Sequence, residues 1–483
     1  MSDTFYITTP IYYVNDKPHI GHAYTTILAD VLARYHRYAG QETFFLTGLD
    51  EHGQKVQQAA EKRGVEAQQH CDEMAPRFTD LWEQLHISHD DFIRTTEERH
   101  KKVVRDILQV VMNKGDIYEA EYEGLYSVSE ERFITEREAE SGEFRDIRKL
   151  KEKNYFFKMS KYQQALIDHI ESNPKFIQPE HRKNEVLGFL RQPLNDLCIS
   201  RPKSRLNWGI ELPFDSDYVT YVWFDALINY ITAPGFGTDE KSFKKWWPAS
   251  YHLIGKDILT THAVYWPTML MSAGLELPKS IFAHGWWLMG ESKMSKSRGN
   301  VINPMDLIED YGVDPVRYYL MREMVLGQDS SFTMESFIQR YNSDLANDFG
   351  NLLSRISTLM KKNYGGKIPN PGGLTNAETT IKSNGESLGE KVNEKIEAMR
   401  LNEAIEEIMQ YVRSVNKYME DNAPWKLVKE DKIAAGRILY TAGEALRISA
   451  VLLSPVMPNR TAILLNALNA QGTRLAWGGL IPG

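Results

Sequence analysis

The order of apolar and polar positions predicts an α/β domain at the N-terminus. Residues 5–9 have the composition of a short β-strand, which Pro10 should end, and a loop through residues 15–18 follows. A second strand is expected at residues 43–47. Between the strands, apolar residues recur at helical spacing: Ile27, Leu28, Val31, Leu32 and Tyr35. Because a strand, a helix and a strand form the unit of a parallel sheet, we expect a ligand site beyond the carboxyl ends of these strands.

Later segments differ in character. Residues 116–212 are irregular and rich in charged and aromatic side chains, which is typical of an insertion, and strand-like runs resume at residues 251–254 and 281–284. After about residue 347 helical periodicity dominates, with a Gly/Pro/Asn-rich loop expected at residues 365–384. We therefore predict an α/β fold: a split Rossmann-like parallel-sheet nucleotide-binding domain, an inserted connective domain and a C-terminal all-α helical bundle.

Composition excludes several classes of protein. The 483 residues suffice for about three domains. Lys plus Arg is 57 against 65 for Asp plus Glu, and the net charge of −8 argues against indiscriminate nucleic-acid binding while it allows a local basic face. Cys71 and Cys198 are too far apart for a C-x-x-C pair and are expected to be structural thiols. The sequence shows neither a membrane span nor a signal peptide, so we expect a cytoplasmic protein.

A first candidate for phosphate chemistry is the segment at residues 18–22. His19 and His22 flank Gly21, which permits close backbone approach, at the start of the predicted helix. The exposed N–H groups and the dipole of a helix N-terminus favour an anion. An isolated pair of this kind also fits hydrogen-bonded structural histidines.

A second candidate is the segment at residues 293–300, Lys-Met-Ser-Lys-Ser-Arg-Gly-Asn, which predicts a mobile loop with three cations. Mobile cations suit a reaction in which charge develops on a polyphosphate, because they can be withheld until the substrate is bound. Taken alone, the segment also fits a solvated basic loop.

The two segments together resemble the signature of class I aminoacyl-tRNA synthetases. Within that class the chain is similar to the methionyl-tRNA synthetase family, and the similarity extends from about residue 5 to residue 425. The matching blocks lie at residues 9–15, 48–53, 221–226, 254–258 and 283–286.

The resemblance implies an ATP-dependent, AMP-forming ligase. Methionine and ATP would give methionyl-adenylate and pyrophosphate, and the methionyl group would then pass to the terminal adenosine of tRNA(Met), initiator tRNA included. Such chemistry needs positioning and charge neutralisation more than a covalent nucleophile. The implied catalytic residues are His19, His22, Lys293 and Lys296. The implied ATP-binding set adds Gly21, Asp257 and His284 to these four, with Mg²⁺ bound alongside ATP.

For the amino acid, the resemblance places Asp50 at the substrate ammonium group. A thioether offers little beyond polarizability and weak acceptor capacity, so selection over leucine must come from aromatic contact, shape and one or two polar hydrogens. Aromatic residues at these positions also fit ordinary core packing. The implied methionine pocket comprises Ile11, Tyr13, Trp223, Tyr230 and His262.

The resemblance also assigns the remaining parts of the chain. In the helical tail, Asn351, Arg355 and Trp425 would read the anticodon by hydrogen bonds and stacking. Many family members bind zinc through cysteine pairs in the insertion, but residues 126–133 contain no cysteine, so we expect a knuckle without metal and no structural zinc. The chain stops soon after the last predicted helix, so a monomer is expected.

The expected domain boundaries follow from these assignments. The Rossmann catalytic domain would comprise residues 1–115 and 216–285, and residues 116–215 would be the connective insertion. Residues 286–347 would hold the Lys-Met-Ser-Lys-Ser loop and a region that contacts the tRNA stem. Residues 348–483 would form the α-helical anticodon-binding domain.

Three alternatives stay open at this point. A synthetase for leucine, isoleucine or valine is disfavoured, because it would need a large editing insertion that this sequence lacks. A cysteine enzyme is disfavoured, because it would need zinc-binding cysteines that are also missing. A small-molecule nucleotidyltransferase would not need a helical tail with Asn351, Arg355 and Trp425. A non-catalytic tRNA-binding relative should have lost signature residues, all of which are intact.

Overall fold

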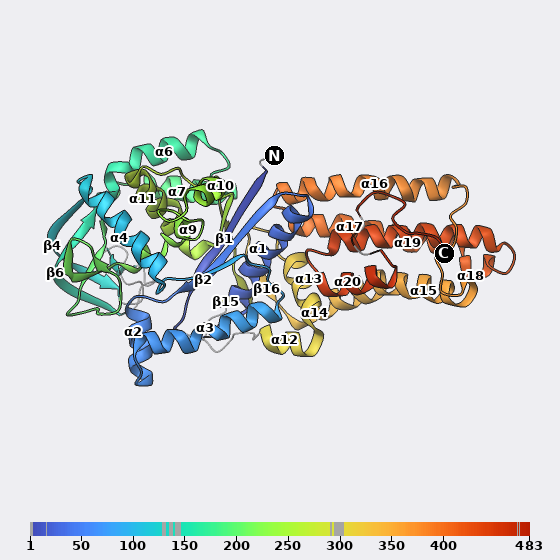
Figure 1. Ribbon diagram of the computed structural model, residues 1–483, viewed down its shortest axis with the longest axis horizontal. Coiled ribbons are helices and arrows are strands. Elements are labelled where there is room, and N and C mark those ends of the chain that lie inside the picture. The colour runs from blue at the N-terminus through green and yellow to red at the C-terminus, as the bar shows by residue number, and fades with distance from the viewer. Residues whose placement is uncertain are drawn as a thin grey trace. The chain divides into compact units, whose positions relative to one another are not determined.

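The computed structural model describes two compact units (Figure 1). One unit comprises Met1–Pro18, His36–Glu83 and Ile87–His284, and the other comprises His19–Tyr35, Gln84–His86 and Gly285–Gly483. The residues described are 3–15, 17–127, 132–134, 139–140, 146–289, 292–293, 304–470, 472 and 474–483.

The first unit is built on a parallel sheet of six strands in the order β3-β2-β1-β12-β13-β7. The chain order reverses between β1 and β12, which is the kind of switch point where α/β proteins bind ligands, beyond the carboxyl ends of the strands. The sheet confirms the predicted α/β class. Its strands are β1 (Thr4–Tyr13), β2 (Glu42–Asp50), β3 (Asp91–Arg94), β7 (Ile177–Gln178), β12 (Tyr251–Gly255) and β13 (Ile281–His284).

Helices cover this sheet with apolar side chains. The buried face of α4 is a regular stripe of Val103, Val104, Ile107, Leu108 and Val111 within the core of the unit. The helices of this unit are α2 (Gln54–Arg63), α3 (Ala67–Gln84), α4 (Glu98–Asn113), α6 (Gln163–Ser172), α7 (Glu180–Leu190), α8 (Val222–Ala226), α9 (Asn229–Thr232), α10 (Glu240–Trp246) and α11 (Trp266–Ala273), with shorter turns at η1 (Met159–Tyr162), η2 (Lys256–Ile258) and η3 (Thr261–Tyr265). Most of α1 (Ile20–Tyr38) belongs to the second unit.

The first strand is longer than the sequence predicts. We expected Pro10 to end it, yet β1 continues to Tyr13, and its pairing with β2 shifts register between Thr8 and Ile11. A proline has no N–H for the ladder and is tolerated in a strand where pairing is irregular. The extension takes Ile11 and Tyr13 to the carboxyl edge of the sheet.

The predicted insertion contains a separate antiparallel sheet, in the order β5-β4-β6-β8. Its long pair, β4 and β6, is braced by three cross-strand ion pairs, among them Lys149 with Glu123 at 2.9 Å. However, β7 lies within the same range and forms an edge of the parallel sheet, so residues 116–215 are not wholly separate from it. The strands are β4 (Ile117–Ser127), β5 (Arg132–Ile134), β6 (Ile147–Phe157) and β8 (Leu197–Cys198), followed by a small sheet of β9 (Ser200–Pro202), β10 (Glu211–Leu212) and β11 (Asp215–Thr220).

The second unit contains the predicted helical bundle. Its central helix, α19, is buried along most of its 22 residues. The loop prediction for residues 365–384 is wrong in its second half, because α16 already begins at Asn376, where the carboxylate of Glu378 accepts a hydrogen bond from the N–H of Thr375 at 2.8 Å.

The other elements of this unit are β14 (Trp287–Met289), β15 (Ser292–Lys293), β16 (Ser330–Phe332), α12 (Pro304–Tyr311), α13 (Val313–Glu323), α14 (Met334–Arg340), η5 (Tyr341–Gly350), α15 (Asn351–Tyr364), α16 (Asn376–Glu397), α17 (Leu401–Asn422), α18 (Pro424–Leu427), α19 (Lys432–Leu453) and α20 (Pro458–Ala467). Among the described residues, no helix has the length and apolar character needed to cross a membrane. Both cysteines are buried free thiols, as predicted.

Candidate functional site

The carboxyl edge of the parallel sheet brings predicted substrate residues together. Tyr13, the last residue of β1, is in register with Asp50, the last residue of β2. Asp50 is 2% exposed, and Ile11 lies two residues before Tyr13 on the same strand. An aliphatic side chain, an aromatic ring and a buried carboxylate therefore meet where a parallel sheet presents its ligand site.

An aromatic wall extends from Tyr13. Its ring contacts Trp223 of α8 edge-on, with centroids 6.3 Å apart, and Trp223 contacts the His262 ring of η3 in the same way at 6.3 Å. The structure thus connects three of the five predicted pocket residues through successive ring contacts. Such edge-to-face contacts fix the orientation of the rings and leave aromatic faces available for contact with a ligand.

Tyr230 and His262 form a buried hydrogen-bonded pair with defined proton positions. Nδ1 of His262 lies 3.0 Å from the carbonyl oxygen of Ile258, an acceptor, so Nδ1 bears the ring proton. Nε2 is then an acceptor for the Tyr230 hydroxyl at 2.8 Å. Burial lowers the pKa of His262 to about 4 and raises that of Tyr230, so the imidazole is neutral and the phenol protonated at neutral pH.

His252, for which the sequence predicts no role, extends this cluster. The ring of His252 lies 4.2 Å from that of Tyr230. Trp266 donates to Nε2 of His252 at 3.2 Å, so Nδ1 bears the proton and donates to Thr8 Oγ1 at 2.8 Å. Burial, with His262 nearby, lowers the pKa of His252 well below its usual value. His252 is therefore a second neutral histidine, and its ring packs against the ring of Tyr230.

A second buried cluster joins the segments that contain Asp50 and Trp223. Asp225, two residues after Trp223, accepts from Nδ1 of His52 and from Nε2 of His100, each at 2.6 Å. Burial alone would raise the pKa of Asp225, but the charge of His52 and the two hydrogen bonds lower it to about 2. Neither His100 nor Asp225 has a role predicted from sequence, because Asp225 and its two histidine partners lie 125 and 173 residues apart along the chain.

Two residues predicted to bind ATP meet at Gly255. A Cβ atom at this glycine would lie 2.6 Å from Asp257 Oδ1 and 3.9 Å from Cε1 of His284. Asp257 follows β12 in the turn η2, and His284 is the buried last residue of β13. A larger residue at this position would displace the Asp257 carboxylate, so Gly255 leaves room for a carboxylate and an imidazole at the ends of adjacent strands.

In the second unit, His19 and His22 stack with their ring centroids 3.8 Å apart. The N–H of Gly21 donates to Nδ1 of His19 at 3.0 Å, and the N–H of His19 lies 3.2 Å from Nδ1 of His22. In its neutral form each ring would have its proton on Nε2, a donor suited to a phosphate oxygen. This differs from the expected N-terminal anion site, because two backbone N–H groups are directed at the imidazoles.

The predicted cationic loop is described only at its start. Lys293 pairs with Leu288 at the end of a hairpin between β14 and β15. Lys296 lies outside the described residues, as do residues 128–131 of the expected knuckle.

The predicted anticodon residues lie in the helical bundle. Asn351 and Arg355 are one turn apart on α15, and Trp425 is the second residue of α18. Arg355 and Trp425 line a surface groove of about 410 Å³ together with Ser354, Thr358 and Leu359. Trp425 is 38% exposed, and Arg355 forms an ion pair with Glu420 at 3.3 Å. An exposed indole beside a guanidinium suits an unpaired base.

The pH dependence of stability tests the neutral state of His262. The unfolded chain binds a proton at this residue below pH about 6.5, and the folded chain does so only below about 4. The contribution of His262 to folding stability is therefore lost as the pH falls through this interval and is fully present above it. In thermal melts at pH 7.5, 6 and 5, His262→Gln should show a smaller decrease than the parent protein. Equal decreases would contradict the assignment.

Comparison with known proteins agrees with this geometry. The sequence pattern of the family described as "tRNA synthetases class I (M)" matches residues 5–143 and 144–357, and that of the "Anticodon binding domain of methionyl tRNA ligase" matches residues 368–479. Methionine–tRNA ligase of Fusobacterium nucleatum is 47% identical over 97% of this chain and 75% of its own length. The enzyme of Thermotoga maritima is 44% identical over 99% of this chain and 78% of its own.

Solved structures give the same result. Mycobacterium tuberculosis methionyl-tRNA synthetase in complex with methionyl-adenylate superposes with a TM-score of 0.95 at 41% identity, over 99% of this chain and 97% of that one. Its apo form gives 0.87 at 39% identity, with coverage of 99% and 95%. The fold and the matched regions define a class I tRNA synthetase. Within this class, the chain belongs to the methionyl-tRNA synthetase family, which confirms the family expected from sequence.

Proposed function

We propose that this synthetase joins methionine to tRNA(Met) in two steps. It activates methionine with ATP to methionyl-adenylate, with release of pyrophosphate, and then transfers the methionyl group to the 3′-terminal adenosine of the tRNA. The single observation that supports this best is the similarity to methionine–tRNA ligases over 97% of this chain, because it includes both the catalytic and the anticodon regions. A direct test is conversion of purified tRNA(Met) to methionyl-tRNA with one AMP released per molecule charged.

The cluster of Ile11, Tyr13, Asp50, Trp223, Tyr230 and His262 in the first unit is our candidate methionine site. Asp50 would bind the substrate ammonium group, since a buried carboxylate gains most from a cationic partner. Ile11, Tyr13 and Trp223 would surround the side chain, and the Tyr230–His262 pair would lie near the thioether. The protonation of this pair supports the assignment, because the Tyr230 hydroxyl donates to His262 and both side chains are neutral at neutral pH.

The ATP-binding and catalytic residues are proposed from their geometry and residue types. His19 and His22 would donate from Nε2 to phosphate oxygens, with Gly21 permitting the approach of the His19 ring. Asp257 and His284 would face the adenosine. Lys293 and Lys296 would stabilise the charge on the leaving pyrophosphate. Mg²⁺ would accompany ATP and neutralise phosphate charge.

The groove of Arg355 and Trp425 is our candidate anticodon site, with Asn351 one turn away on α15. Trp425→Ala should lower kcat/KM for tRNA charging by about 5- to 150-fold, the range expected for loss of one base–aromatic stack. Methionine-dependent ATP–pyrophosphate exchange without tRNA should not change. Ile433→Ala, at an apolar side chain 78% exposed in the same bundle, is the control. Equal charging by both variants and the parent would rule out stacking on Trp425.

Several further properties are proposals of the same kind. Among the described residues no cluster of three or more His, Cys, Asp or Glu side chains could hold a metal ion, and we propose a knuckle without structural zinc. A zinc content near one per chain after removal of adventitious metal would contradict this. We also propose a cytoplasmic monomer. The domain boundaries given above stay predictions, apart from β7 of the expected insertion, which pairs with the parallel sheet.

A further inference from the structure

The helix that contains the candidate anticodon residues includes an unusual segment. α14, η5 and α15 follow one another without a break, and the middle element, Tyr341–Gly350, is π-helical over ten residues. π-helical segments are rare, are mostly limited to a single turn and are frequent at functional sites. Because each π turn contains more residues than an α turn, side chains after it point in a direction that an uninterrupted α-helix would not give. Asn351 and Arg355 come immediately after this segment.

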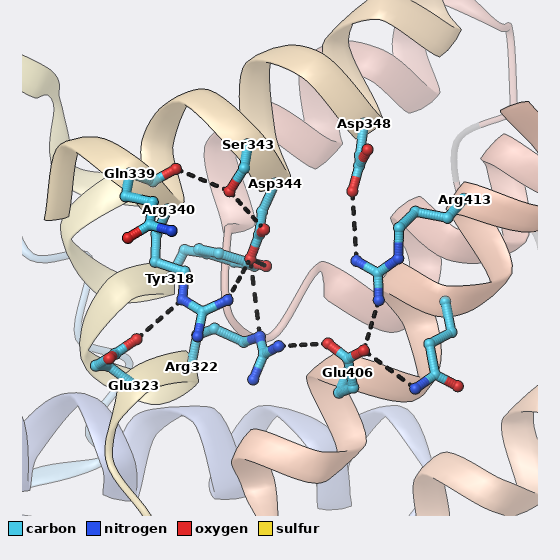
Figure 2. Close-up of polar contacts among 11 residues, drawn as sticks. Tyr318, Arg322, Glu323, Gln339, Arg340, Ser343, Asp344, Asp348, Glu406 and Arg413 are labelled. Carbon is cyan, nitrogen blue, oxygen red and sulfur yellow. Dashed lines mark hydrogen bonds and ion pairs between the residues drawn. The ribbon is translucent and has the colours of Figure 1, made fainter. Parts of the chain in front are cut away.

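Polar contacts from α13 hold the first half of η5 (Figure 2). The buried carboxylate of Asp344 accepts from the Tyr318 hydroxyl at 2.8 Å and from Ser343 Oγ at 2.9 Å. Arg322 and Arg340 form ion pairs with the same carboxylate at 3.8 and 3.6 Å. Asp344 is therefore fixed by partners before and within the segment.

Polar contacts from α17 hold the second half. Arg413 forms ion pairs with Asp348 at 3.3 Å and with Glu406 at 2.5 Å, and Glu406 in turn pairs with Arg322 (Figure 2). The side-chain amide of Asn416 donates to the backbone carbonyl of Asp348 at 2.8 Å. A side chain of α17 thus satisfies a carbonyl within the π segment itself.

The contacts on α17 are regularly spaced. Glu406, Gln410, Arg413 and Asn416 recur at helical intervals, so they form one polar stripe. An apolar face would tolerate several rotations of the neighbouring helix, whereas directional polar partners favour one register. The stripe therefore matches the requirements for fixing a helix rotation.

We propose that the η5 network, defined as Tyr318, Arg322, Asp344, Asp348, Glu406, Arg413 and Asn416, keeps η5 in its π form and thereby orients Asn351 and Arg355 for anticodon discrimination. Asp348 and Arg413 act as positioning residues, since they act through the direction of α15. The inference rests on the proposed anticodon role of Asn351 and Arg355.

The test compares charging of tRNA(Met) with charging of the same tRNA with one anticodon base changed. In Arg413→Met and in Asp348→Asn, kcat/KM for the cognate tRNA should fall about tenfold, in keeping with the cost of a small displacement of a binding group. For the mismatched tRNA, kcat/KM should fall by a smaller factor. The discrimination ratio, which is kcat/KM for the cognate tRNA divided by kcat/KM for the mismatched tRNA, should therefore decrease. Methionine-dependent ATP–pyrophosphate exchange should stay at the parental level, and Arg413→Lys should recover part of the ratio.

Controls separate positioning from general stability and from the function itself. Lys395→Met removes a comparable ion pair between α16 and α17, with Glu403 at 2.7 Å, and should leave the ratio unchanged. An equal loss for both tRNAs, or an unchanged ratio, in Arg413→Met and Asp348→Asn would overturn the inference. If Asn351→Ala and Arg355→Ala also leave the discrimination ratio unchanged, the proposed anticodon role of these residues fails as well. If Asn351→Ala and Arg355→Ala decrease the ratio, the anticodon role stands and only the inference about the η5 network fails.

Discussion

Replacing Asp50 by alanine is expected to lower kcat/KM for methionine in ATP–pyrophosphate exchange by about 30- to 5000-fold, the range for loss of one partner of a buried charge pair. Asp50 is 2% exposed at the end of β2, so water cannot readily replace it as the partner of a substrate ammonium group. The loss should appear mainly as a higher KM for methionine if the interaction is equal in ground and transition states.

The control for this prediction is the KM for ATP, which should change little in Asp50→Ala. Glu42→Gln, at the exposed first residue of the same strand, should behave like the parent protein. Unchanged kinetics for methionine in a folded Asp50→Ala variant would exclude Asp50 as the ammonium partner.

Replacing Asp30 by alanine is expected to lower the free energy of unfolding by about 3 to 5 kcal/mol. Asp30 and Arg317 form a fully buried ion pair at 2.6 Å, and the same guanidinium donates to the carbonyls of Leu85, Pro455 and Val456. The variant would leave the buried charge of Arg317 without its carboxylate partner, and an uncompensated buried charge strongly destabilises the folded state. Denaturation by guanidinium chloride measures the change.

Arg34 supplies the matched control, because it binds the same Asp30 carboxylate at 2.8 Å but is 27% exposed. Arg34→Met should cost about 1 kcal/mol or less, as partly exposed pairs usually do. Similar losses in Arg34→Met and Asp30→Ala would show that burial of the Arg317 pair does not determine the stability of this region.

Much of the fold could be predicted from local sequence patterns. The strand, helix and strand at the N-terminus and the long periodic helices of the tail depend on neighbouring residues, and they appear as expected. The predicted bounds are wrong where contacts with residues distant in sequence determine where a strand or helix begins and ends. β1 continues through Pro10 because its pairing with β2 tolerates a register shift there, and α16 begins within a segment whose composition favoured a loop. β7 joins the parallel sheet through only two residues, too few for a sequence pattern.

The candidate site shows the same division. Residues within short motifs, such as His19 and His22, could be identified from their spacing. Asp225 could not be assigned a role, because its partners His52 and His100 lie 173 and 125 residues away and meet it only in the folded chain. The proton positions of His262 and His252 likewise depend on acceptors and donors that the sequence does not reveal.

The central claim, that this chain activates methionine, is tested most directly by ATP–pyrophosphate exchange with each common amino acid in turn, at fixed Mg²⁺ and without tRNA. We expect exchange with methionine alone. Comparable exchange with another amino acid would contradict the proposed pocket, and the absence of exchange from folded protein would contradict adenylate formation itself.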